Sequence, residues 1–235
     1  MNGLASDPPI EHLSLGDIEG DGDLDVFAPS GSGNTVLLNT DGRLRRFAPT
    51  RVGLPRTSRA GTFVDYDNDG DLDMHLMPQG IFESEDGRFG RTRMLDYERA
   101  GLAYAIDNWA DFDGDGLREP LTARGRDEFA AALTVELRRN TTRASGHWLQ
   151  VDLQGPTGNA QAIGAEARVK VGERWIHQWV GQNDDARFSS GHNRLYFGLG
   201  ESRRVRKLVV RWPDGTKLRR EKVRGDRLLR IAYGD

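Results

Sequence analysis

The sequence contains no cysteine, and this absence excludes disulfide bonds and thiol chemistry. No apolar run approaches the roughly 18 residues that a membrane-spanning helix needs, so no membrane span is expected. Residues 1–4 lack the basic and apolar regions of a signal peptide. An extracellular or periplasmic location is therefore expected only if an N-terminal signal has been trimmed.

The motifs of several enzyme classes are also missing. None of the five histidines is paired at the spacing His-x-x-x-His, so a zinc site is not expected. Gly31-Ser32-Gly33 lacks a third glycine in register, which excludes a dinucleotide-binding fingerprint. These absences argue against zinc enzymes and against enzymes that bind a dinucleotide through this fingerprint.

One polar stretch, residues 181–192, holds side chains that could supply a nucleophile, a base and an orienting acid. They are Asp184, Asp185, Ser189, Ser190 and His192. No nucleophile elbow accompanies them, and a polar loop between two strands commonly contains these residue types. The stretch is better interpreted as an ordinary loop, and the catalytic residues stay unknown.

The composition favours many short strands and tight turns. The chain has 29 glycines, 9 prolines, 37% hydrophobic residues and a mean hydropathy of -0.64. Charge is divided unevenly, because residues 1–137 hold 13 basic and 26 acidic residues and residues 138–235 hold 20 and 10. We therefore predict an all-β chain of two domains, residues 1–143 and 144–235.

The excess of basic residues in the second half does not by itself indicate nucleic acid. These residues flank or alternate with apolar residues, as on the solvent face of a sheet. The acidic first half, of the same or another chain, is the simpler explanation of what these basic residues interact with. No nucleic-acid partner is expected.

Three acidic loops dominate the first half, at residues 17–25, 65–73 and 111–119. Each has acidic residues at positions 1, 3, 5 and 9 and a glycine at position 6. Crowded carboxylates repel one another unless a hard cation lies among them, and an all-oxygen shell of this kind suits Ca²⁺ better than Mg²⁺. The predicted Ca²⁺ ligands are Asp17, Glu19, Asp21, Asp23 and Asp25; Asp65, Asp67, Asp69, Asp71 and Asp73; and Asp111, Asp113, Asp115, Leu117 through its carbonyl, and Glu119.

An EF-hand is the alternative for these loops, and the flanking sequence argues against it. An EF-hand has a bidentate glutamate at position 12 and a helix on each side. Position 12 is Ala28, Leu76 or Thr122 here. Short apolar runs at 26–28 and 74–77 follow the first two loops and predict strands.

The loops recur with a fixed period, starting at residues 17, 65 and 111. The stretches 35–44 and 80–89 each predict a strand, an Asp-Gly turn and a second strand. The third repeat closes with a strand at 134–140 that ends in asparagine, as the strand before Asn39 does. A repeat of about 46 to 50 residues with four short strands is typical of a propeller blade.

The stretch 65–73, preceded by Gly53-Leu54 and followed by a strand, resembles an FG-GAP/VCBS repeat of the cartilage acidic protein type. The resemblance covers residues 3 to about 140 and implies β-propeller blades that bind calcium in an inter-strand loop. Such propellers usually have about seven blades, whereas this chain holds loops for three. A fragment, a homo-oligomer that combines blades, and an open array packed against the second domain all remain open.

The second half predicts an antiparallel β-sandwich or barrel. Residues 147–153 and 165–171 alternate polar and apolar, and 194–197, 207–212, 217–218 and 227–231 also predict strands. The order of Trp148-Leu149, the segment 162–165, the segment 197–200 and the segment 211–215 resembles the ASPIC/UnbV domain. The segment 181–192 departs from the Gly-x-Gly-Tyr-x-Ser-Gln pattern of that family.

Two functions are compatible with this organisation. The first is a calcium-binding, adhesion-type interaction module with a protein or glycan partner. The alternative is a natural-product tailoring or cyclisation enzyme of the UnbV type with a site between the two domains. A pocket with convergent polar groups at that junction would favour the enzyme.

Overall fold

The computed structural model describes residues 10, 12–91, 104–125, 134–142, 146–181 and 192–235. The regular elements among these residues are strands, apart from one short 3₁₀ turn at Pro49–Arg51. The all-β fold class is confirmed. Among the described residues no helix is long or apolar enough to span a membrane.

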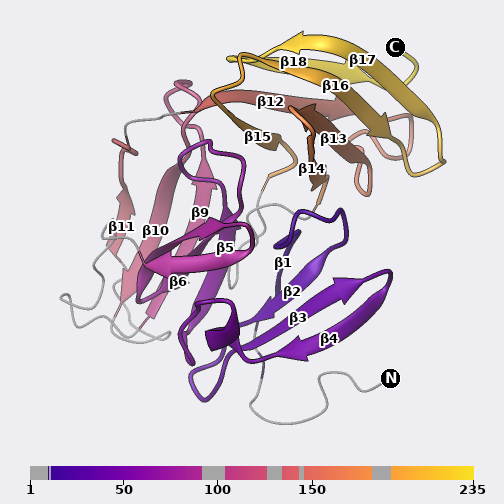
Figure 1. The fold of residues 1–235 in the computed structure, drawn as a ribbon. Coiled ribbons are helices and arrows are strands. Elements are labelled where there is room, and N and C mark those ends of the chain that lie inside the picture. Colours follow the sequence, from indigo (N-terminus) through magenta and orange to yellow (C-terminus); the bar gives the residue numbers. More distant parts are fainter. Residues whose placement is uncertain (1–9, 11, 92–103, 126–133, 143–145, 182–191) are drawn as a thin grey trace.

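The first part of the chain folds into three antiparallel sheets, none of them closed, which we call blades 1 to 3 (Figure 1). Blade 1 has the order β1-β2-β3-β4, with β1 (Ser14–Gly16), β2 (Asp25–Ala28), β3 (Thr35–Thr40) and β4 (Arg43–Phe47). Blade 2 has the order β5-β6-β7-β8, with β5 (Ala60–Val64), β6 (Asp73–Met77), β7 (Gly80–Glu85) and β8 (Arg88–Arg91). Blade 3 has the described order β11-β10-β9, with β9 (Tyr104–Ala110), β10 (Glu119–Gly125) and β11 (Thr134–Leu137).

Two Asp-Gly turns fix the outer hairpins of blades 1 and 2. Asp41-Gly42 joins β3 to β4 with φ angles of 52° and 77°, and Asp86-Gly87 joins β7 to β8 with 49° and 75°. Positive φ at both central residues defines the type I′ turn, whose twist matches the twist of the strands. Both predicted hairpins are confirmed.

The blades pack face to face through alternate residues of their strands. Phe27 and Val36 of blade 1 belong to one buried cluster with Phe63 and Met74 of blade 2. On the opposite face of blade 2, Val64, Tyr66 and Ile81 form a second buried cluster with Trp109 of blade 3.

A polar cluster is buried between blades 2 and 3. The Asp107 carboxylate accepts hydrogen bonds from Thr62 Oγ1 at 3.0 Å and Trp109 Nε1 at 2.8 Å, and it contacts His75 Nδ1. All four side chains are fully buried. A buried carboxylate requires such partners because the cost of leaving it unpaired is large.

The C-terminal part forms two further sheets that face each other across an apolar core (Figure 1). One has the order β15-β12-β18, with β12 (His147–Gln154), β15 (Leu195–Gly200) and β18 (Arg227–Ala232). The other has the order β14-β13-β16-β17, with β13 (Glu166–Val171), β14 (Arg174–Trp179), β16 (Arg204–Arg211) and β17 (Lys217–Arg224). Leu149, Val169, Phe197 and Leu208 are among the buried residues between them.

This sandwich differs from the expected one in one strand pair. β12 and β18 run parallel, whereas the sequence analysis expected antiparallel strands throughout. The two strands are far apart in the chain, so no hairpin constrains their relative direction. The other strand pairs of the two C-terminal sheets are antiparallel, as expected.

Candidate functional site

The three acidic loops have nearly the same backbone geometry. We call them loop 1 (residues 17–25), loop 2 (65–73) and loop 3 (111–119). Their sixth-position glycines, Gly22, Gly70 and Gly116, have φ angles of 93°, 92° and 94°. Only glycine adopts this conformation without strain, which explains its place in all three loops.

The first-position carboxylate closes each loop by accepting the N–H of that glycine. The bond is 2.9 Å from Gly22 N to Asp17 Oδ2 in loop 1. It is 3.1 Å from Gly70 N to Asp65 Oδ2 in loop 2, and 3.1 Å from Gly116 N to Asp111 Oδ2 in loop 3. One oxygen of each first-position acid therefore shapes the loop.

The ninth-position acids have a structural role in addition to the predicted one as calcium ligands. Each accepts one N–H from the second residue of its own loop and one from a later segment. Asp25 accepts the N–H of Ile18 at 2.8 Å and that of Asn39 at 2.7 Å. Asp73 does the same with Tyr66 and Ser84, and Glu119 with Phe112 and Asn140. These acids therefore connect each loop to a later segment of the chain by hydrogen bonds.

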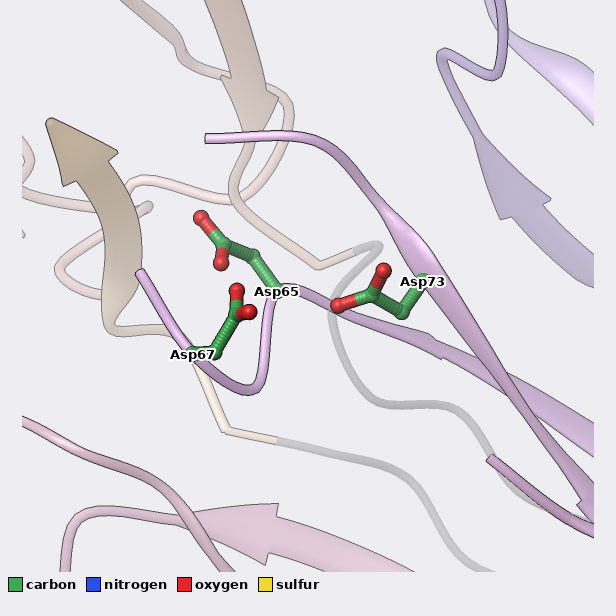
Figure 2. A group of neighbouring side chains, drawn as sticks. All are labelled: Asp65, Asp67 and Asp73. Carbon is green, nitrogen blue, oxygen red and sulfur yellow. The ribbon is translucent and has the colours of Figure 1, made fainter. Parts of the chain in front are cut away.

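Only some of the predicted ligands come together as a group that could hold a metal. Asp65, Asp67 and Asp73 offer carboxylate oxygens within 4.8 Å of one another (Figure 2). Asp111, Asp113 and Asp115 do the same in loop 3. Within the described part of the chain, loop 1 forms no such group, although all its acids are described.

Several of the remaining predicted ligands of loops 1 and 2 have other contacts. Asp69 Oδ1 accepts the N–H of Asp71 at 2.7 Å, and Asp23 Oδ2 accepts that of Asp41 at 2.8 Å. Asp71 Oδ1 lies 2.7 Å from Arg174 Nη1 of β14. A guanidinium therefore occupies one side of loop 2.

Burial gives loop 2 unusual electrostatics. It raises the pKa of Asp65 to about 7, against the opposing influence of the Arg118 guanidinium. Burial, reinforced by the Asp65 charge, raises the pKa of Asp73 well above its ordinary value. Asp65 Oδ1 is buried and has no hydrogen-bond partner. Loop 2 thus contains a buried, unsatisfied carboxylate oxygen on one of the three acids of its group.

Loop 3 is more open than loop 2. Asp113 Oδ2 lies 3.3 Å from Arg139 Nε, and Asp115 Oδ2 lies 3.9 Å from Arg139 Nη2. Both acids and this arginine are exposed, so the pairs contribute little to stability.

The C-terminal sheets dock directly on loop 2. Gly198 N of β15 donates to Asp65 Oδ2 at 3.1 Å, and Gly200 N donates to the Asn68 carbonyl at 3.0 Å. The Arg174 guanidinium, which pairs with Asp71, also donates to the Gly70 carbonyl. The first-position acid of loop 2 therefore belongs to both parts of the chain.

Comparison with known families agrees with this two-part organisation. Residues 17–76 match the family of FG-GAP-like repeats, and residues 155–235 match the family ASPIC and UnbV. The chain joins FG-GAP-like repeats to an ASPIC/UnbV domain. No curated protein matches it significantly.

These two matches confirm both resemblances drawn from the sequence and support interpreting the sheets as propeller-like blades. They indicate a β-repeat module of the adhesion type with a role in protein interaction. The FG-GAP-like match spans loops 1 and 2.

Loop 3 also contacts the ASPIC/UnbV domain. Gln150 Nε2 of β12 donates to Asp111 Oδ2 at 2.6 Å, and Asp111 N donates to the Tyr196 hydroxyl at 3.4 Å. The buried Arg118 guanidinium lies 4.8 Å from the Tyr196 ring centroid and donates to the Asp65 carbonyl at 3.1 Å. Arg118 thus joins loops 2 and 3 to the domain.

Among the described residues at least three hollows lie where the FG-GAP-like blades meet the ASPIC/UnbV domain, and two of them adjoin loops 2 and 3. The first, of about 210 Å³, lies between loops 1 and 2 and the strand β14. The second, which we call the loop 3 pocket, has a volume of about 670 Å³. Phe112, Asp152, Gln161, Asn193, Arg194 and Tyr196 line it, among others.

Of the catalytic candidates considered from sequence, His192 is described, and Asp184, Asp185, Ser189 and Ser190 lie outside the described residues. His192 Nε2 lies 3.2 Å from the Trp109 carbonyl, and its Nδ1 accepts the N–H of Arg194 at 3.2 Å. Both ring nitrogens are thus engaged with the backbone, which is the behaviour of a structural histidine and not of a general base.

Proposed function

We propose that the chain is a calcium-binding, adhesion-type module in which loop 2 holds Ca²⁺ and the blades together with the ASPIC/UnbV domain present a surface to a protein or glycan partner. In this proposal residues 1–143 and 144–235 are its two domains. Calcium would tie them together, because Asp65 contacts both the loop and β15.

The observation that carries the proposal is the Asp65 carboxylate. Its Oδ1 is buried without a hydrogen-bond partner, and the Asp65 carboxylate belongs to the same close group as those of Asp67 and Asp73. An unsatisfied buried oxygen of this kind is costly, and a hard cation with oxygen ligands would satisfy it. FG-GAP repeats often bind calcium, which agrees with this assignment. Asp65, Asp67 and Asp73 would hold the ion, and loop 3 offers a second, more exposed group.

Melting curves of the whole chain in calcium and in chelator test the proposal. A ligand present at about 100 times its dissociation constant stabilises a protein by about 2.7 kcal/mol, which in a chain of this size raises the melting midpoint by about 5–10 °C. We expect calcium to produce a rise of this order and magnesium a smaller one. An unchanged midpoint in calcium would contradict the proposal.

The variant Asp65→Asn isolates the role of Oδ1. Asparagine keeps one carbonyl oxygen for the N–H groups of Gly70 and Gly198 but replaces the other oxygen with a donor that cannot bind a cation. The calcium-dependent rise should shrink strongly in this variant. Asp41→Asn is the matched control, because Asp41 lies in a hairpin turn with positive φ that asparagine tolerates. Its calcium response should equal that of the unmodified chain.

An enzyme of the UnbV type is the second candidate, and the loop 3 pocket between the two domains favours it. The described lining does not combine a nucleophile with an available base. His192 is engaged through both nitrogens, and Asp152 pairs with Arg194 at 3.0 Å. Binding therefore explains the described pocket better than catalysis does.

A further inference from the structure

Loop 3 differs from loops 1 and 2 in the exposure of its second residue. Because the three loops are repeats of one another, the same position can be compared in all three. The second residue of each loop is apolar or aromatic. Ile18 and Tyr66 are 5% and 3% exposed, whereas Phe112 is 51% exposed and lines the pocket. The side chain at this position is buried in loops 1 and 2 but exposed in loop 3, where it lies next to a pocket. An exposed aromatic side chain beside a pocket is typical of a residue that contacts a ligand.

Besides Phe112, the pocket lining includes polar side chains of the C-terminal part with paired donors and acceptors. Arg194 Nε donates to Asp152 Oδ1 at 3.0 Å, and Arg194 Nη1 donates to Gln150 Oε1 at 3.2 Å. The amides of Gln161 and Asn193 are joined by a bond of 3.2 Å at the rim. Planar amides, a carboxylate and a guanidinium each present two polar atoms in a fixed plane.

This lining restricts the chemistry of the ligand. The described arginine in the lining, Arg194, is already paired with Asp152, so an anionic ligand would find no excess positive charge. The second carboxylate of the lining, Asp111, already accepts bonds from Gly114, Gly116 and Gln150, so a cationic ligand would have to compete with these donors. A wholly apolar ligand would cover the carboxylate and amides without replacing their bonds to water, at a considerable cost. A neutral ligand with one apolar face and many hydroxyl groups satisfies both the Phe112 ring and the polar side chains of the lining.

We propose that the loop 3 pocket binds a neutral saccharide unit, with the C–H face of the sugar on Phe112 and its hydroxyl groups on Asp152, Arg194 and the amides of Gln161 and Asn193. The volume of about 670 Å³ lies in the range of roughly 300–1,000 Å³ typical of small-ligand sites. This inference rests on the proposed binding function and names its partner as a glycan.

Titration of the whole chain with neutral oligosaccharides tests the proposal. Suitable probes are cellotetraose, maltotetraose, chitotetraose and mannotetraose, each followed by saturation-transfer NMR and calorimetry in calcium. We expect at least one of them to bind. Phe112→Ala should weaken that binding at least about tenfold because the stacking face is lost, and Phe112→Tyr should retain it.

Leu44→Ala is the matched control. Leu44 is 52% exposed on β4, as exposed as Phe112, and it is absent from the pocket lining. Its substitution should leave saccharide binding unchanged. Failure of all four probes to bind, or binding that Phe112→Ala leaves intact, would overturn the inference.

The outcome is separable from the calcium proposal. The calcium-dependent melting shift is measured without saccharide, and Phe112→Ala should leave that shift intact because the side chain of Phe112 is no candidate ligand. A normal calcium shift without saccharide binding would overturn the pocket assignment alone.

Discussion

Replacement of Asp107 by alanine is expected to destabilise the chain by about 3–5 kcal/mol, which corresponds to a fall in the melting midpoint of about 10–15 °C. Asp107 is fully buried between blades 2 and 3, where Thr62, His75 and Trp109 all contact its carboxylate. Its removal deprives Thr62 and Trp109 of their principal acceptor and leaves a cavity. Both effects act in the same direction.

Urea unfolding of Asp107→Ala, Asp107→Asn and Glu85→Ala measures this effect. Asparagine keeps the volume and one acceptor, so its loss should be smaller than that of alanine. Glu85 is an exposed acid on β7, and its replacement should change the free energy of unfolding by less than about 0.5 kcal/mol. A loss below about 1 kcal/mol for Asp107→Ala would show that the buried cluster does not hold the two blades together.

Local chemistry made the blades predictable from sequence. The Asp-Gly pairs at 41–42 and 86–87 lie between two predicted strands, a context in which Asp-Gly favours a type I′ turn, so their hairpins follow from the sequence. The sixth-position glycines repeat with the loops, and all three adopt nearly the same φ. The strand predicted at 134–140 ends at Leu137, three residues before Asn140. Asn140 is still the counterpart of Asn39, because Asn39 N donates to Asp25 and Asn140 N donates to Glu119.

The strand β14 was not predicted, and its composition explains why. Trp175, His177 and Trp179 alternate with Ile176 and Gln178, so bulky side chains stand on both faces and the usual contrast between an apolar and a polar face is lost. The pairing of β14 with β13 shows which side chains of β14 share a face. Trp175, His177 and Trp179 stand opposite Lys170, Arg168 and Glu166 on β13, whereas Ile176 packs on the apolar core.

The junction could not be predicted for a different reason. The segment 197–200 was recognised as part of a motif, but its contact with loop 2 joins residues more than a hundred positions apart. Neither hydrophobic periodicity nor turn residues give information about a contact between residues so far apart in the sequence. The hydrogen bonds that Asp25, Asp73 and Glu119 accept could not be predicted either. An acid that accepts two N–H groups and an acid that binds a metal look alike in sequence.

Gly198→Ala is expected to separate the ASPIC/UnbV domain from loop 2. A Cβ at Gly198 would lie 2.1 Å from Asp65 Oδ2 and 2.7 Å from Asn68 Cα. Real Cβ contacts are never this short, and the Asn68 backbone cannot rotate away as a side chain would. Relief of the clash must therefore move β15 away from the loop, and it breaks the bonds from Gly198 N to Asp65 and from Gly200 N to Asn68.

The cost of such overpacking is typically about 1–3 kcal/mol, but the diagnostic result is local. Hydrogen exchange at the amides of residues 198 and 200 should accelerate, because both lose their acceptors in loop 2, while exchange in blade 1 stays as it was. Gly90→Ala is the control, since a Cβ there meets no atom within 4 Å. Unchanged exchange at residues 198 and 200 would mean that the domain does not rest on Asp65.

Because Asp65 is also the acid with the unsatisfied oxygen, Gly198→Ala should in addition weaken the stabilisation by calcium without altering any residue of loop 2.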